Sequence, residues 1–376
     1  MSKALCIDAG FEWFTRNGKS LSKVMIIDSK YTEIKEKITE VFDFFEVDVR
    51  DKSVLLKPNL LWPSEPEQGL NTHPLVIEAV VEECERRGAK EVFVGDNAGQ
   101  IMYGNSKGAF YGSGLGERLG KYYVNLGINL EPHYLKESDK TVYISKIIKE
   151  VDYLINIPKF KTHKLTGLTA CLKNTYGYLP GAQKAKGHVS CRTHERFAKF
   201  ISEIHNIRKP DLNIIDSILG MQGNGASSKD LRYIGKIIAS KDPVAADALV
   251  AKMMGMDPSI ILHVKYAQEM GLGTYQNLDI IGDWEVIDGF MLAPGFADPA
   301  QLRDTVTSEG LENDASRMNP IIFKDKCTKC GACVTECPVG ALVMDEFPVE
   351  VAGLCVSCHA CQEICEESAL ILGATI

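Results

Sequence analysis

The chain has 376 residues, of which 45% are hydrophobic and 24% charged, with a net charge of −8. This length suits two or three domains, and the negative charge argues against general nucleic-acid binding. No apolar run reaches the ~20 residues needed to span a bilayer, and the segment after Met1 lacks the pattern of a signal peptide. We therefore expect a cytoplasmic protein with neither nucleic-acid nor membrane partners.

The first elements in chain order predict a strand–helix–strand unit. Apolar residues at helical spacing predict a helix over 32–45, and SVLLK (53–57) predicts a buried strand that ends at Pro58. Pro74 and Gly88 mark the two ends of the next helix, and KEVFVG (90–95) predicts a second strand. Such a unit is typical of a parallel sheet covered by helices.

The same alternation continues to about residue 281. We expect strands at 152–157, 212–217, 234–239 and 278–281, helices at 195–207, 243–255 and 258–270, and glycine-rich loops at 104–116 and 220–225. The predicted fold class is α/β, with mostly parallel sheets flanked by helices over residues 20–300. A connector is expected at 301–320, followed at 321–371 by a small ferredoxin-like α+β domain.

The cysteines indicate iron–sulfur chemistry. Eight of the twelve lie in two repeats that superpose at an offset of 28 residues, CTKCGACVTECPVGAL from Cys327 and CVSCHACQEICEESAL from Cys355. In two-cluster ferredoxins, the fourth cysteine of each run ligates the other cluster. The spacing therefore predicts two 4Fe–4S clusters, one held by Cys327, Cys330, Cys333 and Cys365, the other by Cys355, Cys358, Cys361 and Cys337. Zinc is the alternative, but it has no use for this crossover spacing.

Two further features characterise this C-terminal segment. From Ile321 onward, three lysines stand against eight acidic residues, a net charge of −5, whereas the remaining body carries −3. Pro338 follows the first run as in bacterial ferredoxins, but Glu366 replaces proline after the second. An acidic electron carrier joined to a near-neutral body is the expected arrangement.

Polar side chains follow several predicted strands. Lys57 and Asn59 come after the first strand and Asp96 and Asn97 after the second; Lys159, Lys161 and His163 follow the third, and Asp216 and the Gly223–Gly225 loop the fourth. In open α/β sheets, ligands bind beyond the carboxyl ends of the strands. We therefore expect a binding site at this edge of the sheet.

Residues 153–194 form a 42-residue window with six lysines, one arginine, three histidines and no acidic residue. A solvated basic face is the plain interpretation. The sharper one is a site for an anion, which could be a carboxylate, a phosphate or the acidic ferredoxin domain. Within the window, His188, Cys191 and His194 are three residues apart, which permits a third metal site or, alternatively, a polar loop with an incidental cysteine.

Several segments resemble the family called domain of unknown function 362. They are LLKPNLL (55–61), THPLVIEAV (72–80), GDNAG (95–99), PKFKTHKLTGLTACLKNTYGYLPGAQKAKGH (158–188), IIDSILGMQGNG (214–225) and ASKDPVAADALVAKMMG (239–255). The resemblance implies an α/β fold, iron–sulfur redox chemistry and a cytoplasmic, often anaerobic setting, but no reaction. GDNAG stands where a serine–proline is expected in the middle, which leaves the role of Asn97 open.

The matching positions give the candidate site residues. Lys159, Lys161, His163, Lys173 and His188 are the candidate catalytic residues, and Lys57, Asn59, Asp96 and Asn174 the candidate cofactor-binding residues. The leading hypothesis is a reductase in which the lysines hold a small anionic substrate and His163 or His188 supplies a proton. A flavin could mediate between one-electron clusters and two-electron chemistry. The alternatives are a non-catalytic electron-transfer module that binds a redox partner protein, and a metal or cluster maturation factor.

Overall fold

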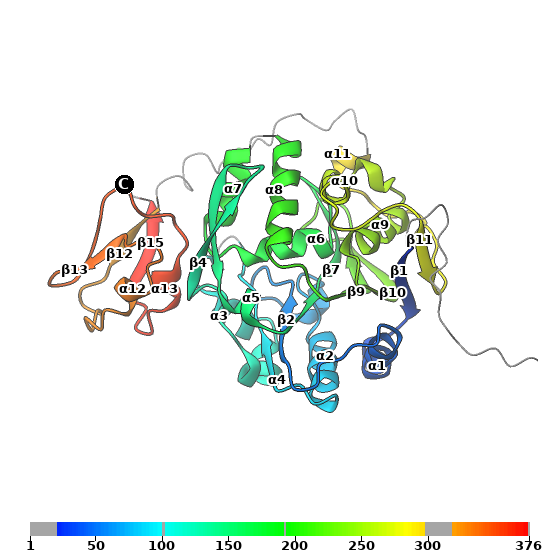
Figure 1. The fold of residues 1–376 in the computed structure, drawn as a ribbon, viewed down its shortest axis with the longest axis horizontal. Coiled ribbons are helices and arrows are strands. Elements are labelled where there is room, and N and C mark those ends of the chain that lie inside the picture. Colours follow the sequence, from blue (N-terminus) through cyan, green and yellow to red (C-terminus); the bar gives the residue numbers. More distant parts are fainter. Residues whose placement is uncertain (1–20, 100–101, 192, 298–317, 375–376) are drawn as a thin grey trace, which may run out of the picture.

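The computed structural model describes residues 21–99, 102–191, 193–297 and 318–374. Over this range the chain forms an α/β body and a smaller C-terminal unit beside it (Figure 1). The predicted connector at 301–320 lies mostly outside the described residues. No helix in the described part of the chain is long and apolar enough to cross a bilayer.

A nine-stranded sheet forms the centre of the body. Its main path runs β11-β1-β10-β9-β6-β2-β3, with β7 paired to β9 and β8 to β7. The pairs β1–β11, β9–β6, β6–β2, β2–β3 and β7–β9 are parallel, whereas β1–β10, β10–β9 and β7–β8 are antiparallel. The strands are β1 (Ser22–Asp28), β2 (Ser53–Pro58), β3 (Glu91–Val94), β6 (Tyr153–Ile157), β7 (Lys159–His163), β8 (Gly167–Thr169), β9 (Leu212–Met221), β10 (Leu231–Ser240) and β11 (Leu278–Ile281). The predicted mostly parallel α/β fold is confirmed.

Helices cover both faces of the sheet, and β4 (Leu130–Leu135) and β5 (Lys140–Ser145) form a separate hairpin. The strands are apolar on both sides, as a doubly covered sheet requires. In β2, for example, Val54 and Leu56 join one buried cluster and Leu55 joins another. The helices of the body are α1 (Ile34–Phe44), α2 (Pro74–Arg86), α3 (Ser106–Tyr111), α4 (Leu115–Leu119), α5 (Ile147–Glu150), α6 (Cys171–Asn174), α7 (Gln183–Cys191), α8 (His194–Ile207), α9 (Pro243–Met253), α10 (Leu262–Glu269) and α11 (Pro294–Ala297).

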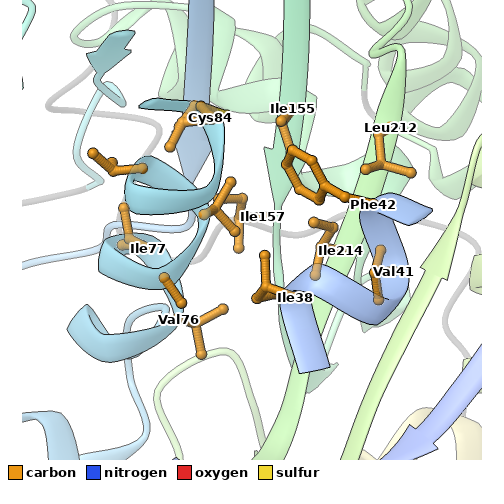
Figure 2. Close-up of a cluster of buried hydrophobic side chains, with 14 of the residues drawn as sticks. Ile38, Val41, Phe42, Val76, Ile77, Cys84, Ile155, Ile157, Leu212 and Ile214 are labelled. Carbon is orange, nitrogen blue, oxygen red and sulfur yellow. The ribbon is translucent and has the colours of Figure 1, made fainter. Parts of the chain in front are cut away.

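The main apolar core lies between the sheet and the helices α1 and α2. Figure 2 shows Phe42 of α1 among side chains of β6 and β9, with Ile77 of α2 nearby. Phe42 and Ile77 are fully buried, because their helical spacing turns one face of each helix to the sheet. On the opposite face, α9 and α10 contribute to a second cluster and α8 to a third.

Three local predictions need correction. The glycine-rich stretch 104–116 contains α3, whose Asn105 side chain caps the helix by accepting from the Gly108 amide at 3.0 Å, and the start of α4. The segment 258–270 is not one helix but a short 3₁₀ turn (Pro258–Ile260) followed by α10. Lys159, Lys161 and His163 do not trail the end of a strand; they lie in a strand of their own, β7.

The C-terminal unit retains the internal repeat of the sequence. It consists of the pairs β12 (Met318–Ile322) with β15 (Leu370–Ala374) and β13 (Leu342–Met344) with β14 (Pro348–Glu350), and of the short helices α12 (Ala332–Thr335) and α13 (Ala360–Glu363). Gly331 caps α12 with φ +77°, and His359, 28 residues later, caps α13 with φ +63°. The left-handed conformation is therefore kept in the second repeat although glycine is not.

The C-terminal unit packs directly on the body. The Glu363 carboxylate accepts hydrogen bonds from the Ser106 amide at 2.9 Å and hydroxyl at 2.8 Å. Gly181 of the body has φ +54°, and a Cβ atom there would lie 2.6 Å from the Cys358 carbonyl oxygen. Because that contact is with backbone, the two units can approach this closely only where residue 181 has no side chain.

We expect Gly181→Ala to separate the two units. Its Cβ would clash with the Cys358 backbone, and small-angle X-ray scattering should record a larger radius of gyration than for wild type. Gly353→Ala is the matched control, because Gly353 also has positive φ (+81°) but a Cβ there meets nothing within 4 Å. If both variants keep the wild-type radius, the contact at Gly181 does not hold the units together.

Candidate functional site

A polar cavity of about 400 Å³ opens at the carboxyl ends of β2 and β3. Its walls come from these strand ends, from β7, α6 and α7, and from the loop 224–227 after β9. Six of the predicted site residues line it together: Asn59, Asp96, Lys161, His163, Lys173 and Asn174. We call this cavity the lysine pocket, because Lys164 and Lys184 also line it.

A buried ion pair lies directly beside the lysine pocket. The Lys57 ammonium lies 2.6 Å from Asp96 Oδ1, and the two side chains are 0% and 3% exposed. Burial lowers the pKa of Lys57, and the Asp96 carboxylate opposes this shift. Gly177 makes room for the pair, since a Cβ atom there would lie 2.4 Å from Asp96 Oδ1. Lys57 is thus a partner of Asp96 and does not itself line the pocket.

None of the lysines that line the pocket forms an ion pair with a carboxylate among the described residues. Lys161 donates to the Leu70 carbonyl oxygen at 2.7 Å, and Lys184 donates to the carbonyls of Asn97 and Ala98. The Lys173 ammonium has no hydrogen bond or ion pair with any described residue and lies 4.4 Å from the centre of the Tyr176 ring. Asp96 is the one acidic side chain among the described residues that line the pocket, and Lys57 already neutralises it.

This lack of partners is reflected in the pKa values. Burial lowers the pKa of Lys161 and of Lys173 to about 7, and neighbouring lysines add to both shifts. For Lys184, burial lowers the pKa to about 8, against the attraction of Asp96. A bound anion would supply the missing counter-charge and raise all three pKa values. The electrostatics of the pocket therefore favour an anionic ligand.

Asparagine side chains connect the pocket to the centre of the sheet. Asn59 donates to Asn174 at 3.0 Å, Asn174 to Asn156 at 2.8 Å, and Asn156 to Asn213 at 2.9 Å. The side-chain amide of Asn97 donates to the carbonyls of Leu126, Gly177 and Tyr178. It therefore holds in place the segment around Gly177, which lines the pocket. Asn97, whose role the sequence left open, thus has a structural role at the pocket.

Several polar atoms at the pocket are buried without a partner in the structure. They are Oδ1 of Asn59, Oδ1 of Asn97 and Oγ1 of Thr169, which all belong to residues that line the cavity. Buried polar atoms are normally hydrogen-bonded to protein or to ordered water. Such a group of atoms at a cationic cavity is typical of a site that holds a ligand or ordered water.

The remaining predicted residues lie in different places. Lys159 is fully buried in β7, away from the pocket, where its ammonium lies 2.6 Å from the Asp216 carboxylate. His163 lines the pocket, and its Nδ1 accepts from the Leu165 amide at 3.1 Å. The backbone of His188 lies in α7, but its side chain is outside the described residues.

The alternative third metal site finds no support among its described members. Cys191 is buried in an apolar cluster with Phe197 and Phe200, and burial raises the pKa of its thiol to about 11. His194 Nδ1 lies 2.9 Å from the Leu165 carbonyl oxygen. Within the described ranges, no three histidine, cysteine or acidic side chains converge closely enough to hold a single metal ion.

The C-terminal cysteines gather in the two sets that the crossover spacing predicts. The outer set, Cys327, Cys330, Cys333 and Cys365, lines a cavity of about 310 Å³, and the inner set, Cys337, Cys355, Cys358 and Cys361, lines another hollow. The amides of Ala341 and Ala369 donate to the sulfurs of Cys337 and Cys365 at 3.1 and 3.2 Å. The outer cavity is larger than one metal ion needs, and amides donate to sulfur in both sets, as at 4Fe–4S clusters. The hollow at the inner set is much smaller, about 20 Å³.

The sequence placed the Gly223–Gly225 loop at the expected site, and residues 224–227 do line the pocket, but it did not select Lys184, Tyr103 or Thr169. Lys184 was visible as part of the acid-free basic window, which was the available signal. Tyr103 and Thr169 reach the pocket through tertiary packing, and no local pattern marks them.

Comparison with known proteins assigns the two parts of the chain separately. The family described as domain of unknown function 362 matches residues 54–252, which is more than half of the chain, and a 4Fe–4S binding domain matches residues 320–343. A thylakoid-associated protein of Synechocystis sp. is 31% identical over 222 residues, which cover 58% of this chain and 68% of that protein. The resemblance seen in the sequence is confirmed.

Two solved structures are weakly similar to the body. The lactate racemase apoprotein from Thermoanaerobacterium thermosaccharolyticum aligns with a TM-score of 0.41 at 11% identity, over 62% of this chain and 57% of that one. A structural-genomics protein from Thermotoga maritima aligns with a TM-score of 0.36 at 11% identity, over 65% of this chain and 60% of that one. The chain thus spans less than two thirds of either protein, and neither likeness bears on function.

We expect Lys57 and Asp96 to be strongly coupled. Lys57→Met or Asp96→Leu alone leaves one buried charge without its partner, which should cost about 3–5 kcal/mol in the free energy of unfolding. The double variant should cost clearly less than the sum of the two single variants, as measured by urea denaturation. Additive losses would show that the two side chains contribute independently.

The lysine pocket should bind anions more tightly at low pH. Lys161 and Lys173, with pKa values of about 7, are protonated below pH 7 and lose charge in the empty pocket as the pH rises. Sulfate, whose charge is constant over this range, should therefore bind more weakly at pH 9 than at pH 6 by calorimetry, with proton uptake above pH 7. An affinity for sulfate that does not change over this range would contradict the assignment.

Proposed function

The chain belongs to the domain of unknown function 362 family, and we propose that it is an iron–sulfur reductase of a small organic anion bound in the lysine pocket. The observation that carries the proposal is the charge of that pocket. Lys161, Lys173 and Lys184 are gathered around one cavity without a free carboxylate among the described residues. Buried cations without counter-ions are costly, so such a site is best explained by an anion that completes it.

The residues divide into three roles. Lys161, Lys173 and Lys184 bind the carboxylate or phosphate of the ligand, and Asn59 and Thr169 offer unpaired oxygen atoms to its polar groups. His163 is the proton donor: in the neutral ring, Nδ1 accepts from the Leu165 amide, so the N–H lies on Nε2. Asp96, Asn97 and Asn174 are positioning residues that hold the lysine-bearing segments in place.

The eight C-terminal cysteines complete the proposal with two 4Fe–4S clusters, one in each set. Clusters of this kind pass single electrons, whereas reduction of an organic molecule takes two electrons and two protons. A flavin bound through its phosphate would therefore be a natural mediator, and it satisfies the same charge requirement. A reducing, oxygen-poor cytoplasm suits exposed cluster cysteines such as Cys330.

Two other functions remain as outcomes of the test. A non-catalytic electron-transfer module needs no ligand in the lysine pocket, and a maturation factor would hand its clusters to another protein. The pocket favours the reductase over both, because Lys161 and Lys184 are buried and Lys173, which is partly exposed, lines the same cavity.

Lys173→Met should abolish reduction of the ligand while the clusters remain. The protein is reduced anaerobically with dithionite, freed of excess reductant, and mixed with a panel of small carboxylates and organic phosphates, and the return of the oxidised cluster absorbance is followed. For the anion that reoxidises wild type, Lys173→Met should slow the reaction by about 10²–10³, the usual cost of losing one stabilising charge.

Lys199→Met is the matched control, because Lys199 is exposed on α8 and does not line the pocket. It should leave the rate unchanged, and wild type and both variants should contain about eight iron atoms per chain. If no anion or bound flavin accepts electrons faster than buffer does, or if Lys173→Met reacts like wild type, the reductase proposal fails.

A further inference from the structure

The two cysteine sets differ in exposure. In the outer set, Cys330 is exposed to solvent, and Cys327 and Cys365 are partly exposed. Cys333 is the one buried member of the outer set. In the inner set, Cys358 and Cys361 are both buried, at 7% and 8% exposure, and Cys337 and Cys355 are partly exposed. The body causes part of this difference: Leu130 of β4 packs with Cys358 and Ala360, and Gly181 lies against the Cys358 carbonyl.

The inner set and the lysine pocket lie on two sides of one wall. The first part of this wall is α7, on the side of the body that faces the C-terminal unit (Figure 1). In its first turns, Lys184 reaches into the lysine pocket, where it binds the carbonyls of Asn97 and Ala98. Lys186, two residues later, lies near Cys355 and Cys358 of the inner set. Helix α7 thus places Lys184 on the pocket side of the wall and Lys186 on the side of the inner cysteine set.

Two aromatic rings form the second part of the wall. Tyr103 lines the lysine pocket, and its ring centre lies 6.0 Å from that of His359, the neighbour of Cys358. His359 is 3% exposed, and its Nε2 is buried without a hydrogen-bond partner. Next to Tyr103, Gly104 has φ +78° and admits the Gln362 side chain, which a Cβ atom would meet at 2.4 Å. The packing of Gln362 against Gly104 therefore supports the contact between the two rings.

We propose that the inner cysteine set delivers electrons to the lysine pocket across the wall of α7, Tyr103 and His359, and that the outer set receives them from a one-electron donor in solution. This order rests on the proposed function. A donor loses one electron at the outer set, and the same electron passes through the inner set to the ligand. Two such electrons and two protons complete the reduction of the ligand. Glu363, which accepts hydrogen bonds from Ser106 and Asn125, keeps the C-terminal unit in contact with the body during these transfers.

The charge of Lys186 gives a test that needs no substrate. A nearby positive charge favours the reduced, more negative state of a cluster, so Lys186→Gln should shift the midpoint potential of one cluster to a more negative value. Lys329→Gln is the counterpart for the outer set, because Lys329 lies between Cys327 and Cys330. It should shift the other cluster alone, and by less, because solvent screens its exposed charge. Lys186→Arg should keep both wild-type potentials.

Midpoint potentials are measured by redox titration followed by electron paramagnetic resonance, with the iron content of each variant as the check on folding. The proposal is overturned if Lys186→Gln shifts neither cluster, or if Lys186→Gln and Lys329→Gln shift the same one. Since no turnover is measured, this failure would leave the reductase proposal standing. Conversely, a missing substrate would leave the titration result intact.

Discussion

The burial of lysine ammonium groups in the sheet is the constraint on which the rest of the site depends. Two of these lysines are neutralised by acids at equal distances of 2.6 Å, Lys57 by Asp96 and Lys159 by Asp216. Lys161 lies on the same strand as Lys159 but has only a backbone carbonyl, and Lys173 has no polar partner among the described residues. The lysines within the sheet are therefore neutralised by carboxylates, whereas those that line the pocket are not. The positive charge without a counter-ion thus lies where a ligand can reach it.

The C-terminal unit and the lysine pocket share structural elements. Helix α7 supplies Lys184 to the pocket and Lys186 to the inner cysteines, and the Tyr103–His359 contact joins the same two places. Close approach at Gly181 and the partly buried hydrogen bonds of Glu363 hold the units together. A cluster domain attached only by a linker would need none of these contacts. Their presence is the structural argument for electron delivery within the chain.

Prediction from sequence succeeded where the constraint was local. The cysteine spacing, with the crossover known from two-cluster ferredoxins, gave the cysteine sets, and short apolar segments gave β2, β6 and β9. It missed β7, because KFKTH places two lysines at fully buried positions, against the usual preference of lysine for solvent. It also gave Lys159 and Lys161 one role, whereas only Lys161 lines the pocket. Lys159 differs from Lys161 because it pairs with Asp216, which is 57 residues away in the chain. A local sequence pattern does not reveal a contact between residues so far apart.

Native mass spectrometry of the anaerobically purified protein tests the central claim most directly. The account predicts a wild-type mass equal to the chain, two 4Fe–4S clusters and one small organic anion or flavin, and loss of the small molecule alone in Lys173→Met. Clusters without any small molecule in wild type, or the same molecule retained by Lys173→Met, would contradict the account. Either result would remove the lysine pocket as the place where the electrons are used.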